Sequence, residues 1–263
     1  MTGSCWQYLL KTEEVEALGT VGLETPAKEC VIEPIDQGLA GDFIKRYEWM
    51  GTIGSSIRSF GLFAEGHLVA VVGFGPARAP NAYSRMLGQD LARSVIQLCR
   101  GASSPQCPKW GPSRLISHAL KHPLLAQKYK IAVAFADPEA GEIGTIYQAC
   151  NAIYSGLTDS HRTPQYIICG ETLDPRRVVA RYGSRARSHL LTVDAKYRSV
   201  PIPAKHRYFL AIGGGRARAG VLRELSRLAL PYPKRYDAAS IPTFQTGSSL
   251  SLVSQLEENT ETI

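Results

Sequence analysis

Apolar runs of strand length alternate along the chain with segments whose apolar residues recur at helical spacing. Two of the runs, joined across Glu65-Gly66, predict a hairpin over 59–76. Further strands are predicted over 30–35, 91–100, 131–136, 166–170 and 205–215. Helices are predicted over 12–18, 41–49, 113–125, 143–155, 174–191 and 216–228. Strands that alternate with helices in this way indicate an α/β fold.

Polar groups that could do chemistry cluster around one predicted strand end. Asp137 follows the last apolar residue of its strand, so the strand would deliver a carboxylate to an edge of the sheet. A helix over 143–155 would place Tyr147, Asn151 and Tyr154 at i, i+4 and i+7, which is one face. Two phenols and an amide would then lie beneath the carboxylate and form a candidate site.

A second candidate site lies at the start of the helix predicted over 113–125. The preceding residues 101–112 are rich in Gly, Pro and Ser and predict a loop, and Ser113 is a natural N-cap. Helix starts bind anions because their N–H groups are unpaired and the positive end of the dipole lies there. The alternative is that this stretch only caps the helix. The groups that could hold a phosphate here are Arg100, Lys109, Gly111, Ser113 and Arg114.

Positive charge is concentrated in one part of the chain. Residues 176–235 hold fifteen Lys/Arg and two acids, a balance of 15 − 2 = +13, so the rest of the chain carries 7 − 13 = −6. Clustered Lys and Arg bind polyanions through release of counterions, which favours nucleic acid over a merely solvated surface. The candidate nucleic-acid contacts in this region are Arg181, Arg185, Arg187, Lys205 and Arg207.

The composition is ordinary for a globular protein, with 44% hydrophobic and 20% charged residues. No apolar run suits a membrane span and no secretory leader is recognisable, so an intracellular protein is expected. Six scattered cysteines without a C-x-x-C pair favour reduced thiols over disulfides or a zinc site. We expect an arm or short helix over 1–30, one domain over 31–236 and a polar, flexible tail over 237–263.

Several motifs together resemble known families. The chain contains, in order, a strand, a phosphate loop, a helix, a strand and a helix that ends in NAIYSGL over 151–157. This order resembles the GCN5-related N-acetyltransferase (GNAT) superfamily. Four segments are more specific: 113–120 after Arg100, 136–156, 205–212 and YPKR over 232–235. Together they resemble the Mom family of bacteriophage DNA-modification proteins, a divergent GNAT branch. The resemblance covers about residues 31 to 236.

The resemblance implies an enzyme that converts adenine in DNA to the N6-carbamoylmethyl form and protects phage DNA from restriction. It implies a GNAT-like mixed central sheet flanked by helices, with a basic C-terminal helical extension. The implied donor is acetyl-CoA or a related acyl donor, and the implied partner is double-stranded DNA with a flipped adenine, in the cytoplasm of the infected bacterial host. An iron requirement and the oligomeric state, a homodimer included, stay open.

The resemblance also suggests roles for the first candidate site. Asp137 would accept the N6 proton or hold the amine by a hydrogen bond. Tyr154 matches the GNAT tyrosine that protonates a departing coenzyme A thiolate, Asn151 would bind the pantetheine amides, and Tyr147 would meet the base. Core packing is the alternative for each tyrosine. In the interval before Gly144 many family members carry a His where this chain has Glu142, which would have to substitute for it.

Other aromatic and histidine side chains are weaker candidates. Tyr47, a candidate catalytic residue, and Trp49 could stack on an adenine taken out of the duplex, or could pack in the core. His118 and His122 have the i, i+4 spacing of metal ligands without an H-E-x-x-H motif, so a structural role is favoured.

Three other functions remain as alternatives. An adenine-N6 methyltransferase is faintly suggested by Asp137-Pro138, but Glu139 and Ala140 follow where such enzymes continue with a proline and an aromatic residue. A non-catalytic DNA-binding protein would explain the basic region and leave the tyrosines without purpose. An ordinary GNAT acting on another amine would explain the tyrosines and leave the basic region without purpose.

Overall fold

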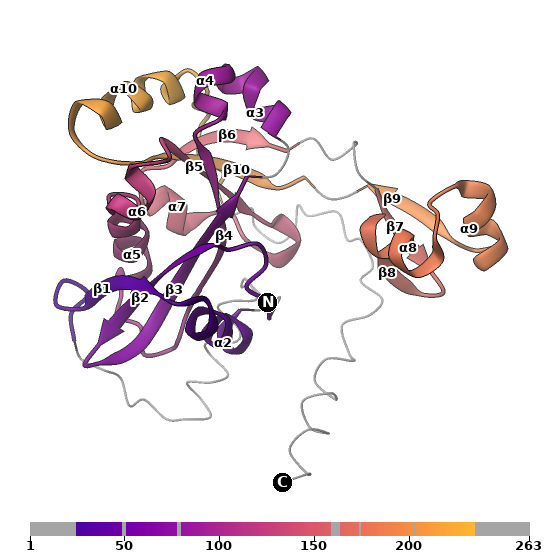
Figure 1. The fold of residues 1–263 in the computed structure, drawn as a ribbon, viewed down its shortest axis with the longest axis horizontal. Helices are drawn as coiled ribbons and strands as arrows, with labels where there is room; N and C mark the ends of the chain where they lie inside the picture. Colours follow the sequence, from indigo (N-terminus) through magenta and orange to yellow (C-terminus); the bar gives the residue numbers. More distant parts are fainter. Residues whose placement is uncertain are drawn as a thin grey trace, which may run out of the picture. The chain divides into compact units, whose positions relative to one another are not determined.

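A seven-stranded mixed sheet organises most of the chain (Figure 1). The computed structural model describes residues 25–48, 51–77, 80–158, 164–173, 175–201 and 204–234. The strands of this sheet are β1 (Val31–Ile35), β2 (Arg58–Ala64), β3 (His67–Pro76), β4 (Val95–Ser103), β5 (Ile131–Ala136), β6 (Ile153–Leu157) and β10 (His206–Ala211). Their order is β1-β2-β3-β4-β5-β10-β6. Within this sheet β4 pairs with β5 in parallel, and the other neighbouring pairs are antiparallel.

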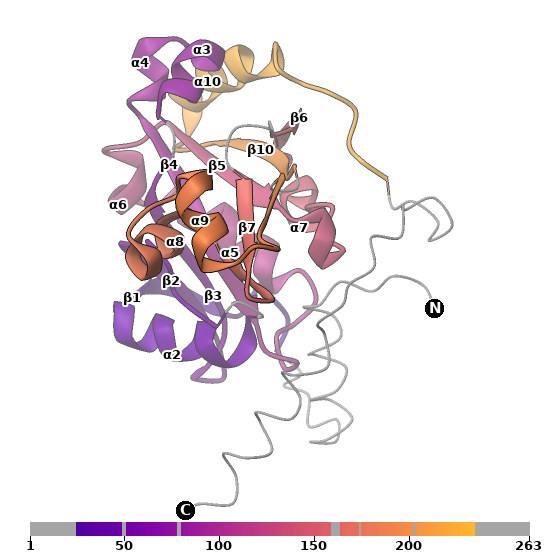
Figure 2. The same cartoon turned by 90° about the vertical axis from the view of Figure 1, so that its right-hand side faces the viewer.

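Helices cover both faces of this sheet. The first face carries α5 (Gly111–Ala119), α6 (Pro123–Ala126) and α7 (Thr145–Ala149), which pack on alternate residues of β2 to β5 and β10. The opposite face carries α2 (Gln37–Tyr47) over β3 and β4. It also carries α3 (Pro80–Leu87), α4 (Gln89–Ala92) and α10 (Gly215–Ser226), which lie together at one end of the sheet (Figures 1 and 2). The predicted mixed central sheet flanked by helices is confirmed.

Several predicted elements are confirmed and others are shifted. The strand over 131–136 has the predicted bounds, and the predicted hairpin turns at Glu65 and Gly66, whose φ angles of 50° and 81° suit a two-residue turn. The strand predicted over 91–100 begins later and continues through 101–103, because Leu91 lies in α4 and Ser103 still pairs with Ala70 of β3. The helices α3 and α4 were not predicted.

The helix predicted over 143–155 is wrong. Helix α7 ends at Ala149, Asn151 adopts a left-handed φ of 55°, and β6 then begins at Ile153. Asn tolerates this conformation better than most residues, so it turns the chain into a strand. Tyr154 therefore pairs with Tyr208 across β6 and β10 and does not share a helix face with Tyr147.

A separate three-stranded sheet is formed by β7 (Pro164–Ile168), β8 (Glu171–Leu173) and β9 (Arg198–Pro201), in the order β8-β7-β9. Helices α8 (Pro175–Tyr182) and α9 (Arg187–Val193) pack on it, as Figure 2 shows. The helical region predicted over 174–191 is thus two helices, interrupted at Gly183, whose φ is 78°. We call residues 164–201 the small unit. Its buried core is its own and consists of Ile168, Leu173, Val178 and Leu190.

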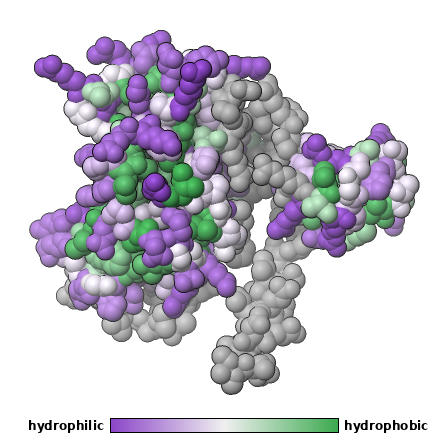
Figure 3. All heavy atoms as spheres, in the orientation of Figure 1, coloured by the Kyte–Doolittle hydropathy of each residue, from purple (hydrophilic) through white to green (hydrophobic). Residues whose placement is uncertain are grey.

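The surface of the main-sheet body is mixed in character. On the face that Figure 3 presents, hydrophobic residues gather in the middle and hydrophilic residues surround them. Within the part of the chain that the structure describes, no helix is both long enough and apolar enough to cross a membrane. The helix predicted over 12–18 and the tail predicted over 237–263 lie outside the described residues.

Candidate active site

The parallel strands β4 and β5 separate after a short pairing. They are in register from Val95 with Ile131 to Gln97 with Val133, and both strands continue beyond that point. Opposite the separation, the pairing of β4 with β3 shifts by a bulge between Gly73 and Phe74. Beyond Gln97 and Val133 the two strands are no longer paired with each other. The sheet is therefore open at the carboxyl ends of these two strands.

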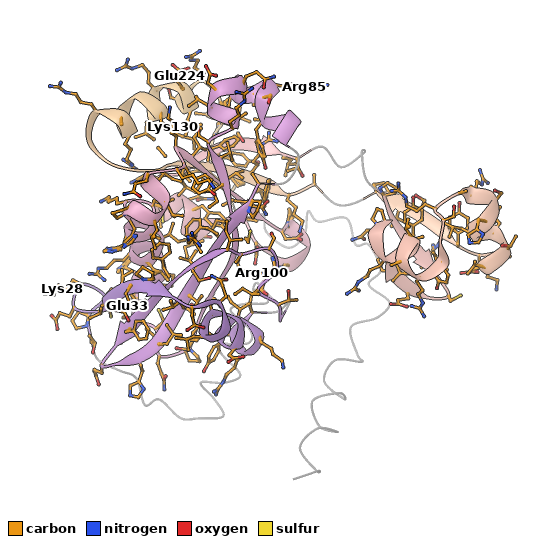
Figure 4. The ribbon with its side chains drawn as sticks, in the orientation of Figure 1. Lys28, Glu33, Arg85, Arg100, Lys130 and Glu224 are labelled. Atoms are coloured by element: carbon orange, nitrogen blue, oxygen red, sulfur yellow. The ribbon has the colours of Figure 1, made fainter. Side chains whose placement is uncertain are left out.

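Arg100 joins one side of this opening to the end of α2. Its Nε donates to the Thr52 carbonyl oxygen at 2.6 Å and lies 3.9 Å from Oε2 of Glu48. Figure 4 labels Arg100. The Arg100 and Glu48 side chains are only 18% and 9% exposed. The guanidinium predicted to neutralise a phosphate thus has protein partners already.

A cluster of three charged groups occupies the other side, at the end of β5. Nζ of Lys205 lies 2.5 Å from Oδ2 of Asp137, whose side chain is 13% exposed. The Asp137 backbone N–H donates to Oε2 of Glu142 at 3.1 Å. The N–H of Glu142 in turn donates to the Asp137 carbonyl at 2.9 Å, which closes the turn between them. We call Asp137, Glu142 and Lys205 the acid cluster.

Burial shapes the electrostatics of the opening. It raises the pKa of Glu142, and the nearby Asp137 charge raises it further, whereas the hydrogen bond from Asp137 N–H and the Lys205 ammonium act in the opposite direction. Burial also raises the pKa of Tyr147, followed by the charges of Glu142 and, more weakly, Glu48. Tyr147 therefore stays protonated over the ordinary pH range.

Three tyrosine rings meet on the first face of the sheet. The fully buried Tyr208 of β10 lies 5.4 Å from the Tyr147 ring and 5.1 Å from the Tyr154 ring, between centroids. The Tyr208 hydroxyl donates to the Ile143 carbonyl at 2.5 Å. Gly144 rests on this ring with a φ of 73°, and a Cβ there would overlap the ring. Tyr147 and Tyr154 thus both contact the ring of Tyr208.

The hydroxyls of the two predicted tyrosines have different surroundings. The Tyr147 hydroxyl donates to the Phe135 carbonyl at 3.5 Å, one residue before the strand end that precedes Asp137. The Tyr154 hydroxyl lies 2.9 Å from Nδ1 of His206, and both side chains are buried. The Tyr147 hydroxyl therefore meets the chain two residues before Asp137, and the Tyr154 hydroxyl belongs to a buried pair with His206.

The start of α5 differs from the prediction. The N-cap is Trp110, in a left-handed conformation with φ of 70°, and the Ser113 hydroxyl donates to the Trp110 carbonyl at 3.0 Å. Ser113 as the N-cap is wrong, because the helix begins two residues earlier, at Gly111. The Gly111 N–H donates to the Pro108 carbonyl and Pro112 has no N–H, so fewer donors remain for an anion.

The cations near this helix start are held unequally. Arg114 donates to the carbonyls of Cys30 and Lys28 at 2.8 and 3.2 Å, so its guanidinium is tied to the chain before β1. Lys109 is exposed, with Nζ 5.3 Å from the centre of the Trp110 ring. A Cβ at Gly111 would lie 2.8 Å from Sγ of Cys107, so close packing requires the glycine.

The chain matches the family model of the Mom protein family over residues 29–234, a range that includes the whole opening and the acid cluster. The chain belongs to the Mom protein family. A curated relative, methylcarbamoylase Mom of Escherichia phage Mu, is 31% identical over 147 residues. That alignment covers 55% of this chain and 60% of the relative.

Solved structures with a related arrangement are acetyltransferases. An IAA acetyltransferase from Bacillus cereus covers 70% of this chain and 100% of its own, with a TM-score of 0.38 at 10% identity. A Bacillus subtilis acetyltransferase in complex with CoA covers 70% and 99%, with a TM-score of 0.37 at 9% identity. A spermidine/spermine N-acetyltransferase from Vibrio cholerae, in complex with manganese ions, covers 75% and 97%, with a TM-score of 0.38 at 11% identity.

The remaining site predictions fall at scattered places in this Mom family member. The Tyr47 ring packs on Phe43 at 4.7 Å, and Arg46 lies over it. Asn151 is exposed in the turn before β6, and Trp49 lies outside the described residues. None of these roles is tested by the structure, and all of them stay predictions.

The predicted nucleic-acid residues are divided between the small unit and the main-sheet body, and they differ in their partners. Arg207 is bonded to Ser155 through its Nε at 2.9 Å, and Arg181 is paired with Glu171 in the small unit. Arg185 and Arg187 are exposed in the small unit, at and just after the turn between α8 and α9. Lys205 belongs to the acid cluster.

The described residues contain no group of three or more His, Cys, Asp or Glu side chains placed to hold a metal ion. The two candidate histidines have other contacts. Nδ1 of His122 accepts the Leu124 N–H at 3.2 Å and caps α6, and its ring lies 5.2 Å from the Phe60 ring. Burial, followed by the neighbouring His122, lowers the pKa of His118.

Two buried aromatic side chains that contact the predicted tyrosines were missed at the sequence level. Tyr208 and His206 lie on β10, where alternate residues face the same side of the sheet as Tyr154. The segment over 205–215 was predicted as a strand, and alternate residues of a strand share a face, which was the signal available for His206 and Tyr208. It did not indicate which residues of other strands they would meet.

Proposed function

We propose that this Mom family member is a transferase that converts adenine in DNA to the N6-carbamoylmethyl form and thereby protects phage DNA from restriction. The observation that carries the proposal is the carboxylate of Asp137, held by Lys205 at the open end of β4 and β5 in a chain of this family. The activity named for the phage Mu relative, methylcarbamoylase, agrees with this assignment.

The chemistry gives each of two side chains a task. Adenine N6 is a weak nucleophile because its lone pair is delocalised into the ring, so an enzyme must position it and take up its proton. Asp137 receives that proton as the bond from N6 to the donor carbon forms. Tyr147 donates its hydroxyl proton to the group that leaves the donor. The Tyr154 hydroxyl is bound to Nδ1 of His206 at 2.9 Å, whereas the Tyr147 hydroxyl has only a longer bond of 3.5 Å to a carbonyl, and we therefore assign the acid to Tyr147.

The donor in this proposal is acetyl-CoA or a related acyl donor. Because the carbamoylmethyl group joins N6 through its methylene carbon, the balance also requires an amine that replaces the coenzyme A thiolate at the carbonyl and an oxidant that takes two electrons from the methyl carbon. The diverging edges of β4 and β5 offer main-chain hydrogen-bond partners to an extended amide chain. Lys109 is the exposed cation closest in sequence to the start of α5 and is suited to a phosphate. Arg100 and Arg114 would have to release the carbonyls that they bind in order to meet one.

Double-stranded DNA is the proposed partner. Arg185 and Arg187 of the small unit are exposed cations and suit the phosphate backbone. The adenine must leave the duplex to bring N6 to Asp137, because a stacked and paired base keeps its amine in the groove. Tyr47 at the end of α2 is the described aromatic residue that we propose for stacking on the flipped base.

The test is a nucleoside analysis of DNA from cells that express this protein. Digestion and mass spectrometry should reveal an adenosine heavier by the carbamoylmethyl increment. Unmodified adenosine in cells that contain folded protein would refute the proposal. A methyl increment would indicate a methyltransferase, and an acetyl increment would indicate an ordinary acetyl transfer, in which N6 attacks the carbonyl carbon of the donor.

A further inference from the structure

We infer that Lys205 and Glu142 are positioning residues of the reacting centre, which hold the Asp137 carboxylate ready for the adenine amine. This inference rests on the proposed function and adds two residues to it. The basic region of the sequence suggested a different task for Lys205, contact with DNA phosphate. The geometry around its ammonium points to the site instead.

The backbone of Lys205 is fixed on both sides. Its N–H donates to the Thr158 hydroxyl at 2.9 Å, and its carbonyl accepts the Thr158 N–H at 2.9 Å. These bonds clamp Lys205 to the end of β6, immediately before β10 begins. Since His206 of β10 is paired with Ala136 of β5, the lysine is placed next to the residue that follows β5, which is Asp137.

The side chain uses this placement to reach the carboxylate. Nζ lies 2.5 Å from Oδ2 of Asp137, the Asp137 side chain is 13% exposed, and that of Lys205 is 39% exposed. The short distance and the low exposure of the Asp137 side chain distinguish this ion pair from one between two solvent-exposed side chains. The ammonium is therefore directed into the site.

Glu142 acts on the backbone of the same aspartate. Its Oε2 accepts the Asp137 N–H, and its own N–H donates to the Asp137 carbonyl. This reciprocal pair fixes the turn through Pro138–Ala140 and with it the direction in which the Asp137 side chain leaves the backbone. The Asp137 side chain is oriented by the backbone turn and by the Lys205 ammonium. It therefore loses little conformational freedom when the adenine amine binds.

The charges of Asp137, Glu142 and Lys205 also compensate one another. Two carboxyl groups in one corner repel each other when both are ionised, and the Lys205 ammonium offsets this repulsion. Without Lys205 this repulsion would turn the Asp137 carboxylate away from Glu142. It would then no longer point at the adenine amine.

The test compares substitutions at Lys205 in the full chain. Lys205→Met removes the ammonium, Lys205→Arg restores a cation, and Lys130→Met serves as the control. Lys130 is an exposed lysine just before β5, at the opposite end of that strand from Asp137 (Figure 4). Modified adenosine is measured by mass spectrometry, and affinity for a DNA duplex is measured across a range of salt concentrations.

We expect Lys205→Met to lower the modification rate by about 10²-fold, the cost of a slightly misplaced group, with Lys205→Arg recovering much of it. The salt dependence of DNA binding should be that of the wild type, and Lys130→Met should modify DNA like the wild type. Full activity of folded Lys205→Met would overturn the inference. So would a salt slope reduced by about 0.9, the amount of one phosphate contact. A wild-type protein that modifies no adenine would instead overturn the proposed function.

A second pair of variants tests Glu142. Glu142→Gln keeps an oxygen that can accept the Asp137 N–H, whereas Glu142→Ala removes it. If Glu142 acts through this bond, the Gln variant should modify DNA faster than the Ala variant, by about tenfold for a loosened backbone. Equal activity of the two variants, with thermal unfolding showing both folded, would remove Glu142 from the inference.

Discussion

The acid cluster and the small unit both concentrate charge, and they hold it in opposite ways. In the acid cluster each charged group has a partner in the protein, with Lys205 on Asp137 and the Glu142 oxygen on the Asp137 N–H. In the small unit Arg185 and Arg187 extend from the surface. The first arrangement fixes the position of one carboxylate, and the second spreads positive charge over a surface.

This difference sets the size of the effects that mutations should have. Where charges are paired and sheltered, removal of one partner leaves the other in an unfavourable environment, so single changes have large effects. Where charges are exposed and solvated, each contributes a small and similar share to binding. The predictions below test this contrast, from the largest expected effect to the smallest.

Asp137→Asn should have the largest effect. The amide is close to the carboxylate in shape and cannot take up the N6 proton, so the modification rate should fall by about 10³-fold. DNA affinity should stay near that of the wild type, because Asp137 belongs to the acid cluster and not to an exposed cationic surface. Quantitative nucleoside analysis and a duplex-binding titration measure the two quantities. Modification at the wild-type rate would exclude Asp137 from the mechanism.

Tyr147→Phe should have the next largest effect, a loss of about 10²-fold in the modification rate, because the proton for the leaving group is removed. Tyr154→Phe is the matched variant, since it removes a hydroxyl from the same cluster of rings. The Tyr154 hydroxyl is bound to His206 in the interior, and its loss should lower thermal stability more than activity. If Tyr154→Phe lost more activity than Tyr147→Phe, Tyr154 would be the residue that protonates the leaving group.

The two tyrosines also show what the sequence could and could not predict. The apolar run of β5 predicted its strand with the right bounds and placed Asp137 at the strand end. The spacing of Tyr147 and Tyr154 suited one helix face, but the helix ends at Ala149 and Tyr154 lies on β6. A short segment satisfies helical and strand periods alike, and pairing with β10 decides between them.

Contacts between distant segments account for most of what was missed. The charge balance predicted a basic region, and the structure divides it between the small unit and the body of the main sheet. Lys205 belongs to that region by sequence and to Asp137 by geometry. Lys205 and Asp137 are brought together by the pairing of β5 with β10. The composition of a segment gives the sign of its charge but does not indicate such a partner.

A double replacement in the small unit should have a smaller effect than either site variant. Arg185→Ala with Arg187→Ala removes two exposed cations, so duplex affinity should fall several-fold and the slope of log affinity against log salt should decrease by about 1.8. The control is Arg216→Ala with Arg223→Ala, which removes the same charge from exposed positions of α10. If the control changes the slope and the first variant does not, DNA binds α10 and not the small unit.

Glu142→Gln tests the acid cluster through stability. The pKa of Glu142 is raised above its usual value of 4.5, mainly by burial, so the folded protein holds this proton more tightly than the unfolded chain does. The stabilisation is complete below the unfolded value and is lost as the pH rises through the folded pKa. Glutamine carries no charge, so the variant should unfold at a higher temperature than the wild type at about pH 7.

The same comparison at low pH provides the control for this last prediction. At about pH 4 the wild-type Glu142 is protonated in the folded protein, so the melting temperatures of the variant and the wild type should converge. Asp137, Lys205 and Tyr147 face Glu142 and are unchanged by the substitution. A variant that is less stable at neutral pH would show that attraction to Lys205 outweighs burial and repulsion by Asp137. Glu142 would then be a partner in the ion pair, and the acid cluster would be held together by charge more than by its backbone turn.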